Sequence, residues 1–403
     1  MSNIKKIILA LSKESKEVFS LIQKKGPITK NELQHLTNTN LTTLNRIMQP
    51  LEDNNLVIPV GIGESSGGRK PVLFDINNTD FYVIGIDISR LFTQIVITNL
   101  KLDVLQKKLF QMDETYTPDK TVSTIEKLYK EALRELNIEE QSILGIGLGT
   151  VGPLDRNAGI MQNPQHFPAQ NWQNTPIREL LETKLGMPIY IDNGANTAIL
   201  AESIFGDGKG FKNIAYFNCS VGIRTGALSS GNIVRTINDA EDAFAHMVID
   251  VDGEKCSCGN YGCIDCYSSI FSIVQKFVSA LKKGRLSHIS KPVEIIDYID
   301  ICHLAEEGDE LAKEIITGAA TIFGVGLANY INLLNPSLII LSGPLISQSD
   351  LFYHICTEVA VNRLYTKSSN NIFFNKGGRF GDDAISIGAA TMVVENYVSH
   401  SFR

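Results

Sequence analysis

The sequence predicts an α/β body of two lobes behind a small, mostly helical N-terminal module. Two observations carry this prediction. Helical patterns fill residues 13–53, and two strand-like runs follow them. From residue 81 the chain alternates buried strand-like runs with helical segments, and several of the runs end in glycine. At 403 residues the chain is long enough for two or three domains with sizeable cores.

The N-terminal module begins with three expected helices. Residues 13–25 have an amphipathic pattern, and a Gly-Pro pair ends that helix. Thr29 and Glu32 have the spacing of a capping box, which starts a short second helix. The third helix is expected over residues 41–53, and Pro50 is expected to kink it or to turn its end into 3₁₀ form. Its buried side carries Leu44, Ile47, Met48 and Leu51, and its opposite face carries Thr42, Thr43, Asn45 and Arg46.

Two strand-like runs, residues 56–60 and 71–76, flank a glycine-rich loop that ends in basic residues. Three helices and such a hairpin predict a winged helix-turn-helix. Residues 1–75 carry ten Lys and Arg against seven Asp and Glu, which leaves 27 against 37 for the remainder, and a basic module on an acidic body fits a DNA reader. A small protein-interaction domain is the alternative. The candidate DNA-binding residues are Thr42, Thr43, Asn45 and Arg46 in the third helix and Arg69 and Lys70 in the wing.

The body has the pattern of two ribonuclease-H-like lobes, because antiparallel strands open each half, glycine turns follow strands, and helices lie between them. Such lobes enclose a ligand in the cleft between them. We place the N-terminal module at residues 1–77, the first lobe at 78–200 with a C-terminal helix at 381–403, and the second lobe at 201–380. The expected strands are 82–88, 93–100, 102–111, 142–149, 189–192, 213–219, 226–228 and 337–341, and the expected helices are 118–136, 195–205, 268–283, 308–317, 318–334 and 385–395.

A metal site is expected where His246 precedes Cys256, Cys258 and Cys263. Three thiols and one imidazole form a closed Cys₃His set for structural Zn²⁺, with no position left for a reacting water. Cys266 is the alternative to His246 as fourth ligand, and a group of buried free cysteines is the other explanation. Metal-type cysteines, no apolar run of the roughly 18 residues of a membrane span, and no signal peptide predict a cytoplasmic protein.

Several motifs together resemble the ROK family, in which bacterial sugar kinases and sugar-responsive repressors share one body. The resemblance covers nearly the whole chain and implies lobes of the actin and sugar-kinase type. The N-terminal module resembles that of the repressor branch and is absent from the plain kinases. The motifs are Gly85-Ile-Asp87, Gly145-Ile-Gly147, Gly152-Pro-Leu-Asp155, Asn193-Gly-Ala-Asn196 through Glu202, His246 with the cysteine element, and Leu334-Asn-Pro336.

The resemblance implies that kinase chemistry has been lost. Family kinases take a proton from the sugar with the aspartate of an Asn-Asp-Ala-Asn run, and Gly194 stands at that position here. Their glycine-rich phosphate turns are replaced around Asp87, around Ser220–Arg224 and at Gly343. Asp87 is therefore expected to be a structural remnant.

The carbohydrate side has also changed. The glutamate that grips sugar hydroxyls in the family is Ala243 here, and the one after the last zinc cysteine is Asp265. Arg224 is expected either to recognise an anionic effector or to form a salt bridge at the surface or between the lobes. The candidate ligand-binding residues are His166, Asn193, His246 and Asp265.

The sequence therefore predicts a DNA-binding transcriptional regulator, a repressor of carbohydrate uptake or metabolism genes, with a catalytically inactive sugar-kinase-like body that senses an effector. The expected partners are double-stranded operator DNA, a small carbohydrate-like effector and a second copy of the chain, in a homodimer or a dimer of dimers, with no membrane. The alternatives are an ATP-dependent sugar kinase of the ROK family and a ligand-independent repressor or protein-interaction scaffold.

Overall fold

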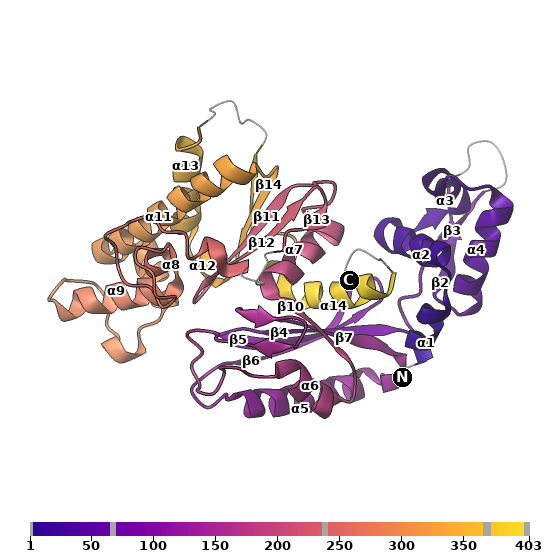
Figure 1. Cartoon of the computed structure of the whole chain (residues 1–403), viewed down its shortest axis with the longest axis horizontal. Helices are drawn as coiled ribbons and strands as arrows, with labels where there is room; N and C mark the ends of the chain where they lie inside the picture. The colour runs from indigo at the N-terminus through magenta and orange to yellow at the C-terminus, as the bar shows by residue number, and fades with distance from the viewer. Residues whose placement is uncertain (1–2, 65–69, 236–240, 366–371, 399–403) are drawn as a thin grey trace.

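The computed structural model describes residues 3–64, 70–235, 241–365 and 372–398. The chain forms an N-terminal module and a body with two five-stranded sheets (Figure 1). Reading from the first sheet's far edge the strand order is β10-β7-β4-β5-β6, and the second sheet runs β15-β14-β11-β12-β13. In both sheets an antiparallel hairpin is followed by parallel strands, so the two lobes repeat one topology. The predicted α/β class with two sheet-based lobes is confirmed.

The first sheet is covered by helices on both faces. Helices α5 and α6 pack on one face through an apolar core, and α14 lies on the other face (Figure 1). Helix α14 touches the strands directly, since a Cβ at Gly85 would lie 1.8 Å from Ser386 O and one at Gly147 would lie 1.9 Å from Ala389 O. The elements are β4 (Tyr82–Ile88), β5 (Phe92–Asn99), β6 (Val104–Gln111), α5 (Pro118–Leu136), β7 (Ile143–Thr150), the short pair β8 (Leu154–Asp155) and β9 (Ile160–Met161), α6 (Ile177–Leu185), β10 (Ile189–Asn193) and α14 (Ala384–Val398).

Helix α7 (Gly194–Phe205) connects the two lobes. It follows β10 directly, packs against α14, and also contacts β11 and β12 of the second sheet. Thr197 Oγ1 donates a hydrogen bond of 3.0 Å to Ile385 O, which ties α7 to α14. The two helices therefore lie between the two sheets (Figure 1).

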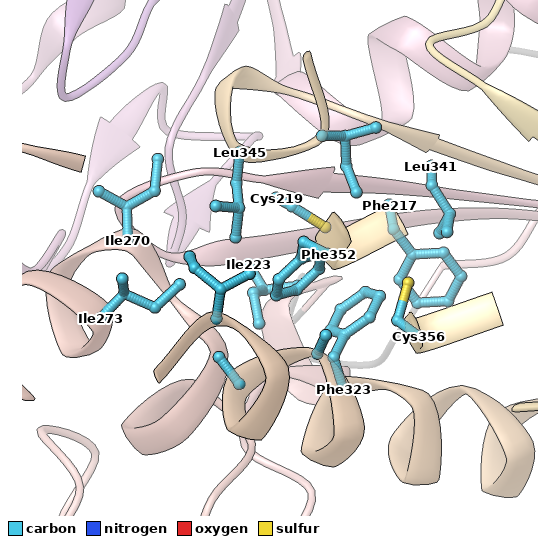
Figure 2. Close-up of a cluster of buried hydrophobic side chains, with 14 of the residues drawn as sticks. Phe217, Cys219, Ile223, Ile270, Ile273, Phe323, Leu341, Leu345, Phe352 and Cys356 are labelled. Carbon is cyan, nitrogen blue, oxygen red and sulfur yellow. The ribbon is translucent and has the colours of Figure 1, made fainter. Parts of the chain in front are cut away.

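The second lobe is built around a cluster of aromatic and aliphatic side chains from its sheet and its helices (Figure 2). Phe217 and Phe323 are fully buried there, with ring centroids 5.9 Å apart. The elements are β11 (Ile214–Cys219), β12 (Ile223–Ser229), β13 (Asn232–Ile233), α8 (Asp265–Ser268), α9 (Ile270–Lys282), α10 (Tyr298–Glu307), α11 (Glu310–Leu334), β14 (Leu338–Ser342), α12 (Pro344–Gln348), α13 (Asp350–Asn362) and β15 (Phe373–Lys376).

One long helix replaces two expected ones. Residues 308–317 and 318–334 were expected as separate helices, but α11 runs through Gly318 without a break. Gly318 is exposed, so its cost of about 1 kcal/mol is small beside the burial of the rest of the helix. Among the described residues α11 is the one helix long and apolar enough to cross a membrane, and 56% of its apolar window is buried inside the protein.

The N-terminal module combines four helices with a three-stranded sheet of order β1-β3-β2 (Figure 1). The expected capping box forms, because Glu32 N donates to Thr29 Oγ1 and Thr29 N donates to Glu32 Oε2. Helix α4 keeps its α-helical form through Pro50 to Asp53, so the expected 3₁₀ ending is wrong, and the expected kink stays a prediction. The elements are α1 (Asn3–Ala10), α2 (Lys13–Lys25), β1 (Ile28–Thr29), α3 (Lys30–Thr37), α4 (Leu41–Asp53), β2 (Val57–Ile62) and β3 (Val72–Ile76).

The module is joined to the body through α2 and α14. Their apolar side chains belong to one buried cluster, which includes Phe19 and Val393. Lys24 Nζ lies 2.8 Å from Glu395 Oε1, and the Glu395 side chain is 5% exposed. Lys209, just after α7, donates a hydrogen bond to Lys24 O. The end of α2 is thus bonded both to the C-terminal helix and to the segment that enters the second lobe.

Candidate functional site

The four predicted metal ligands lie together. The ligand atoms of His246, Cys256, Cys258 and Cys263 are all within 4.8 Å of one another. Cys258 Sγ and Cys263 Sγ are 3.7 Å apart, and Cys256 Sγ is 3.5 Å from His246 Nδ1. A tetrahedral ion with Zn–S bonds of about 2.3 Å requires sulfur atoms about 3.8 Å apart, so the arrangement fits zinc. Cys266 is outside this cluster, and its thiol donates to Glu254 O.

The segment from Cys256 to Cys263, which we call the metal loop, folds on itself through backbone hydrogen bonds. Cys256 N donates to Asn260 O and Gly259 N donates to Cys256 O, which brings the first two thiols beside the third. A bridge between Val248 and Cys263 ties this loop to the segment that follows His246. Burial opposes ionisation of the Cys256 thiol, but hydrogen bonds from Cys258 and the other ligands outweigh it and lower its pKa to about 7.

A cavity of about 130 Å³ lies between the lobes next to the metal loop, and we call it the interlobe cavity. Three of the four predicted ligand-binding residues line it, namely His166, His246 and Asp265. Asn193 does not, because its side chain caps α7 by accepting a hydrogen bond of 3.0 Å from Ala195 N. Ala243, which stands where the resemblance implied a glutamate, lines the wall of the cavity together with Ala245.

His166 occupies an unusual position at the mouth of this cavity. Its φ is +62°, a backbone conformation that non-glycine residues adopt mainly at turns and functional sites. Its ring stacks on Phe271 of α9 with centroids 4.1 Å apart, so the contact crosses from one lobe to the other. Burial and the neighbouring Arg90 guanidinium lower the pKa of His166, which favours the neutral imidazole.

Two residues at or beside the interlobe cavity were not expected from the sequence. Arg90 lines the interlobe cavity, and its Nε donates a hydrogen bond of 2.6 Å to Gln165 O. Phe271 is 42% exposed although it is a large apolar side chain. The sequence held a signal for Arg90, because this arginine replaces a glycine of the phosphate turn that the resemblance places around Asp87. Phe271 has no sequence signal of its own, since its helix has an ordinary amphipathic pattern.

A buried arginine lies beside Gly194, the position at which the resemblance implies an aspartate in the family kinases. A Cβ at Gly194 would lie 2.7 Å from Arg224 Nη1, so the guanidinium occupies the space beside the missing aspartate. Arg224 is 3% exposed, and its Nη2 donates to Asn218 Oδ1 and to Ser89 Oγ, each at 3.2 Å. Ser89 Oγ in turn donates to Asp87 Oδ1 at 2.6 Å. We call this chain of contacts across the lobes the arginine relay.

The arginine relay leaves little room for a ligand. The space among its side chains is about 10 Å³, which holds about one water molecule. Burial raises the pKa of Asp87 to about 6, while Arg224 and the Ser89 hydrogen bond oppose the rise. Asp382 also lines this space, and Asp192, two positions before Gly194, pairs with Arg235 at 2.6 Å. Of the two expected roles of Arg224, the geometry therefore favours the interlobe bridge.

The candidate DNA-binding residues gather on the first turns of α4. Thr42, Asn45 and Arg46 are exposed and Thr43 is half-buried, while the opposite side of the helix is in the module core. Asn45 Oδ1 accepts a hydrogen bond of 3.1 Å from Lys30 Nζ, which also pairs with Glu52. Lys70 is exposed beside the hairpin, and Arg69 lies outside the described residues.

Comparisons with known proteins agree on one family. The model of the ROK family matches residues 83–396. The xylose repressor of Bacillus spizizenii is 28% identical over 377 residues, which are 94% of each chain. The transcriptional repressor Mlc of Escherichia coli is 24% identical over 345 residues, which are 85% of this chain and 83% of that protein.

Solved structures share the fold. A ROK family transcriptional regulator homologous to the Escherichia coli protein Mlc superposes with a TM-score of 0.77 at 22% identity and covers 97% of both chains. A ROK glucokinase from Streptomyces griseus, in complex with glucose and AMPPNP, has a TM-score of 0.66 at 22% identity. It covers 77% of this chain and 98% of its own.

Proposed function

The chain belongs to the ROK family, and from this premise we propose that it is a DNA-binding transcriptional regulator, a repressor of carbohydrate uptake or metabolism genes. The observation that carries the proposal is the exposed polar face on the first turns of α4, on a module that lies outside the residues matched by the ROK family. Relatives that match along nearly the whole chain are named as sugar repressors. The proposal places the protein in the cytoplasm.

The N-terminal module is, in this proposal, a winged helix-turn-helix with α3 and α4 as its helix pair and β2–β3 as its wing. Helix α4 enters the major groove, where Thr42, Thr43, Asn45 and Arg46 meet base edges. Arg46 carries the largest share because a guanidinium can bind guanine with two hydrogen bonds. Lys70 and Arg69 of the wing contact phosphates, so binding weakens steeply with added salt.

The body serves as a sensor and not as a kinase. Gly194 offers no proton acceptor, and the Arg224 guanidinium fills the adjacent space that a phosphoryl group would need. General-base assistance is worth roughly 10²–10⁴-fold in rate, so its loss alone would nearly abolish phosphoryl transfer. The interlobe cavity remains open to a carbohydrate-like effector, held by His166, His246 and Asp265. Asn193 supports that site indirectly, because it caps α7.

A structural Zn²⁺ would be held by His246, Cys256, Cys258 and Cys263. The ion closes the metal loop and fixes the imidazole that also lines the interlobe cavity. Its binding energy therefore becomes part of the stability of the effector site.

Effector binding reaches the DNA-binding module through α7 and α14. Closure of the cleft moves the second lobe and, with it, Lys209, which is bonded to the end of α2. The Lys24–Glu395 pair holds the same end to α14. In a homodimer, or a dimer of dimers, this motion changes the spacing of two reading helices and weakens binding to a two-fold operator.

The test begins with selection of binding sites from fragmented genomic DNA, followed by fluorescence anisotropy on a selected duplex. Arg46→Ala is expected to weaken binding by about 1–3 kcal/mol, or roughly 5- to 150-fold. Arg134→Ala, an exposed arginine on α5 of the body, is the matched control and should bind as the wild type does. Failure to select any duplex, or equal binding by both variants, would overturn the proposal.

The rival activity needs its own measurement. Purified protein is incubated with ATP and a panel of aldohexoses, aldopentoses and N-acetylated hexosamines, and ADP release is followed. No release above that of heat-denatured protein is expected. Sugar-dependent turnover would establish a ROK kinase that carries a DNA-binding module.

A further inference from the structure

A second space adjoins the interlobe cavity on its outer side. This groove has a volume of about 740 Å³ and lies between α9 and the metal loop; we call it the outer groove. His166, Ser257 and Asp265 line both spaces, so the cavity and the groove meet at a shared wall. The cavity alone, at about 130 Å³, is small beside the roughly 300–1,000 Å³ of typical ligand sites. A ligand that uses both spaces reaches that range.

The junction of the two spaces carries an aromatic platform. His166 from the first lobe and Phe271 from the second are stacked there, with an angle of 27° between the rings. The exposed Phe271 ring lines the outer groove and not the interlobe cavity. Flat apolar faces of this kind receive the apolar face of a ligand, while nearby polar groups fix its orientation.

The outer groove is positively charged. Four cationic side chains line it, Lys255, Lys276, Lys283 and Arg285, against two carboxylates, Glu254 and Asp265. Lys276 pairs with Glu254, and Arg285 pairs with Glu314. Within the described residues, Lys255 and Lys283 have no carboxylate partner within 4 Å, so their charges are available to a ligand.

From this arrangement we propose that the effector is an anionic glycoside of at least two units. One sugar ring occupies the interlobe cavity, and the second unit lies over the Phe271 ring in the outer groove. A negatively charged group on that second unit, a phosphate or a carboxylate, lies beside Lys255 and Lys283. The inference rests on the proposed role of the body as an effector sensor. It moves anion recognition away from Arg224, which is engaged in the arginine relay.

The experiment measures binding of four probes to the full-length protein by isothermal titration calorimetry. The probes are cellobiose, cellobiose 6′-phosphate, a disaccharide ending in glucuronic acid, and glucose, and the series is repeated with galactose-ended disaccharides. At least one anionic disaccharide is expected to bind about tenfold or more tightly than its neutral form. The phosphate and uronate arms show which anionic group is preferred. Inorganic phosphate alone should not reproduce the effect.

Two lysine variants decide whether the outer groove is responsible. Lys283→Gln should remove most of the preference for the anionic disaccharide, whereas Lys282→Gln, which removes an adjacent charge outside the groove lining, should retain it. The proposal is overturned if no anionic disaccharide binds better than its neutral form, or if Lys283→Gln leaves the preference unchanged. Operator binding without sugar is measured in parallel, so failure of the ligand arm alone leaves the regulator proposal standing.

Discussion

The arginine relay and the interlobe cavity occupy two halves of the same cleft and differ in almost every physical respect. In the relay, charge from one lobe meets charge from the other, and about 10 Å³ of space remains. In the cavity, about 130 Å³ remains and opens toward a basic groove of about 740 Å³. The relay is therefore filled by side chains of the protein, while the cavity remains accessible to a ligand. In the function that we propose, the body keeps ligand-dependent closure without phosphoryl transfer.

The largest expected effect on stability is at the metal cluster, which adjoins the interlobe cavity. Cys263→Ser removes a fully buried ligand from the metal cluster. Loss of the ion should lower the melting temperature by roughly 10 °C or more, because metal binding contributes directly to folding. The zinc content, measured by plasma mass spectrometry, should fall from about one equivalent to far less. Cys266→Ser, which lies outside the cluster, should keep both properties, and a metal-free wild type would refute the assignment.

The arginine relay can be disrupted by a substitution at Arg224. Arg224→Ala leaves Asp87 buried and without its neighbouring positive charge, which costs about 3–5 kcal/mol. The free energy of unfolding in urea measures this loss. A second change, Asp87→Asn, removes the buried charge and should recover more than half of the stability. An Arg224→Ala protein as stable as the wild type would contradict an electrostatic bridge between the lobes.

The pH dependence of the free energy of unfolding also tests the buried charge of Asp87 in the arginine relay. Because burial raises the pKa of Asp87 to about 6, the folded protein holds this proton more tightly than the unfolded chain, where the pKa is near 3.8. The stabilising contribution of Asp87 is therefore complete below about pH 4 and is lost as the pH rises through 6. Asp87→Asn should gain up to roughly 3 kcal/mol relative to the wild type between pH 4 and pH 7. Parallel pH profiles would show that Asp87 ionises normally.

The smallest expected effect is at the ion pair between Lys24 and Glu395, which joins the N-terminal module to the body. Lys24→Met removes the cation that faces the buried Glu395 carboxylate. Hydrogen exchange in α2 should become about fivefold faster, which corresponds to about 1 kcal/mol of local stability. Lys13→Met, on the same helix but paired with the exposed Glu17, should exchange as the wild type does. Equal exchange in both variants would mean that the ion pair does not hold the module to the body.

The fold was largely predictable where local signals and burial agree. Helix α4 has the predicted bounds, because Asn40 caps its first turn and Leu44, Ile47 and Met48 repeat with the helical period. The sequence predicted two helices, 308–317 and 318–334, where α11 is continuous, and Gly318 at their junction is exposed and tolerated within the helix. Helices α1, α6, α10, α12 and α13 were not expected at all.

The sequence predicted the metal ligands of the site better than the contacts between its distant residues. The spacing of His246 and three cysteines predicted the cluster, because a short loop limits how far these ligands can separate. The motif also suggested Asn193, but its amide is used to start α7. The stacking of His166 on Phe271 joins residues more than one hundred positions apart, and only the closed arrangement of the lobes brings them together.

The position of α14 sets the order in which the protein can mature on the ribosome. The strands β4 and β7 are synthesised long before the helix that covers them, because β7 ends at Thr150 and α14 begins at Ala384. The nascent first sheet therefore keeps one apolar face uncovered until α14 has left the exit tunnel, and such surfaces are prone to aggregation or chaperone binding. A prematurely terminated chain would carry the N-terminal module without the helix that anchors it, so quality control of truncated products matters for this protein.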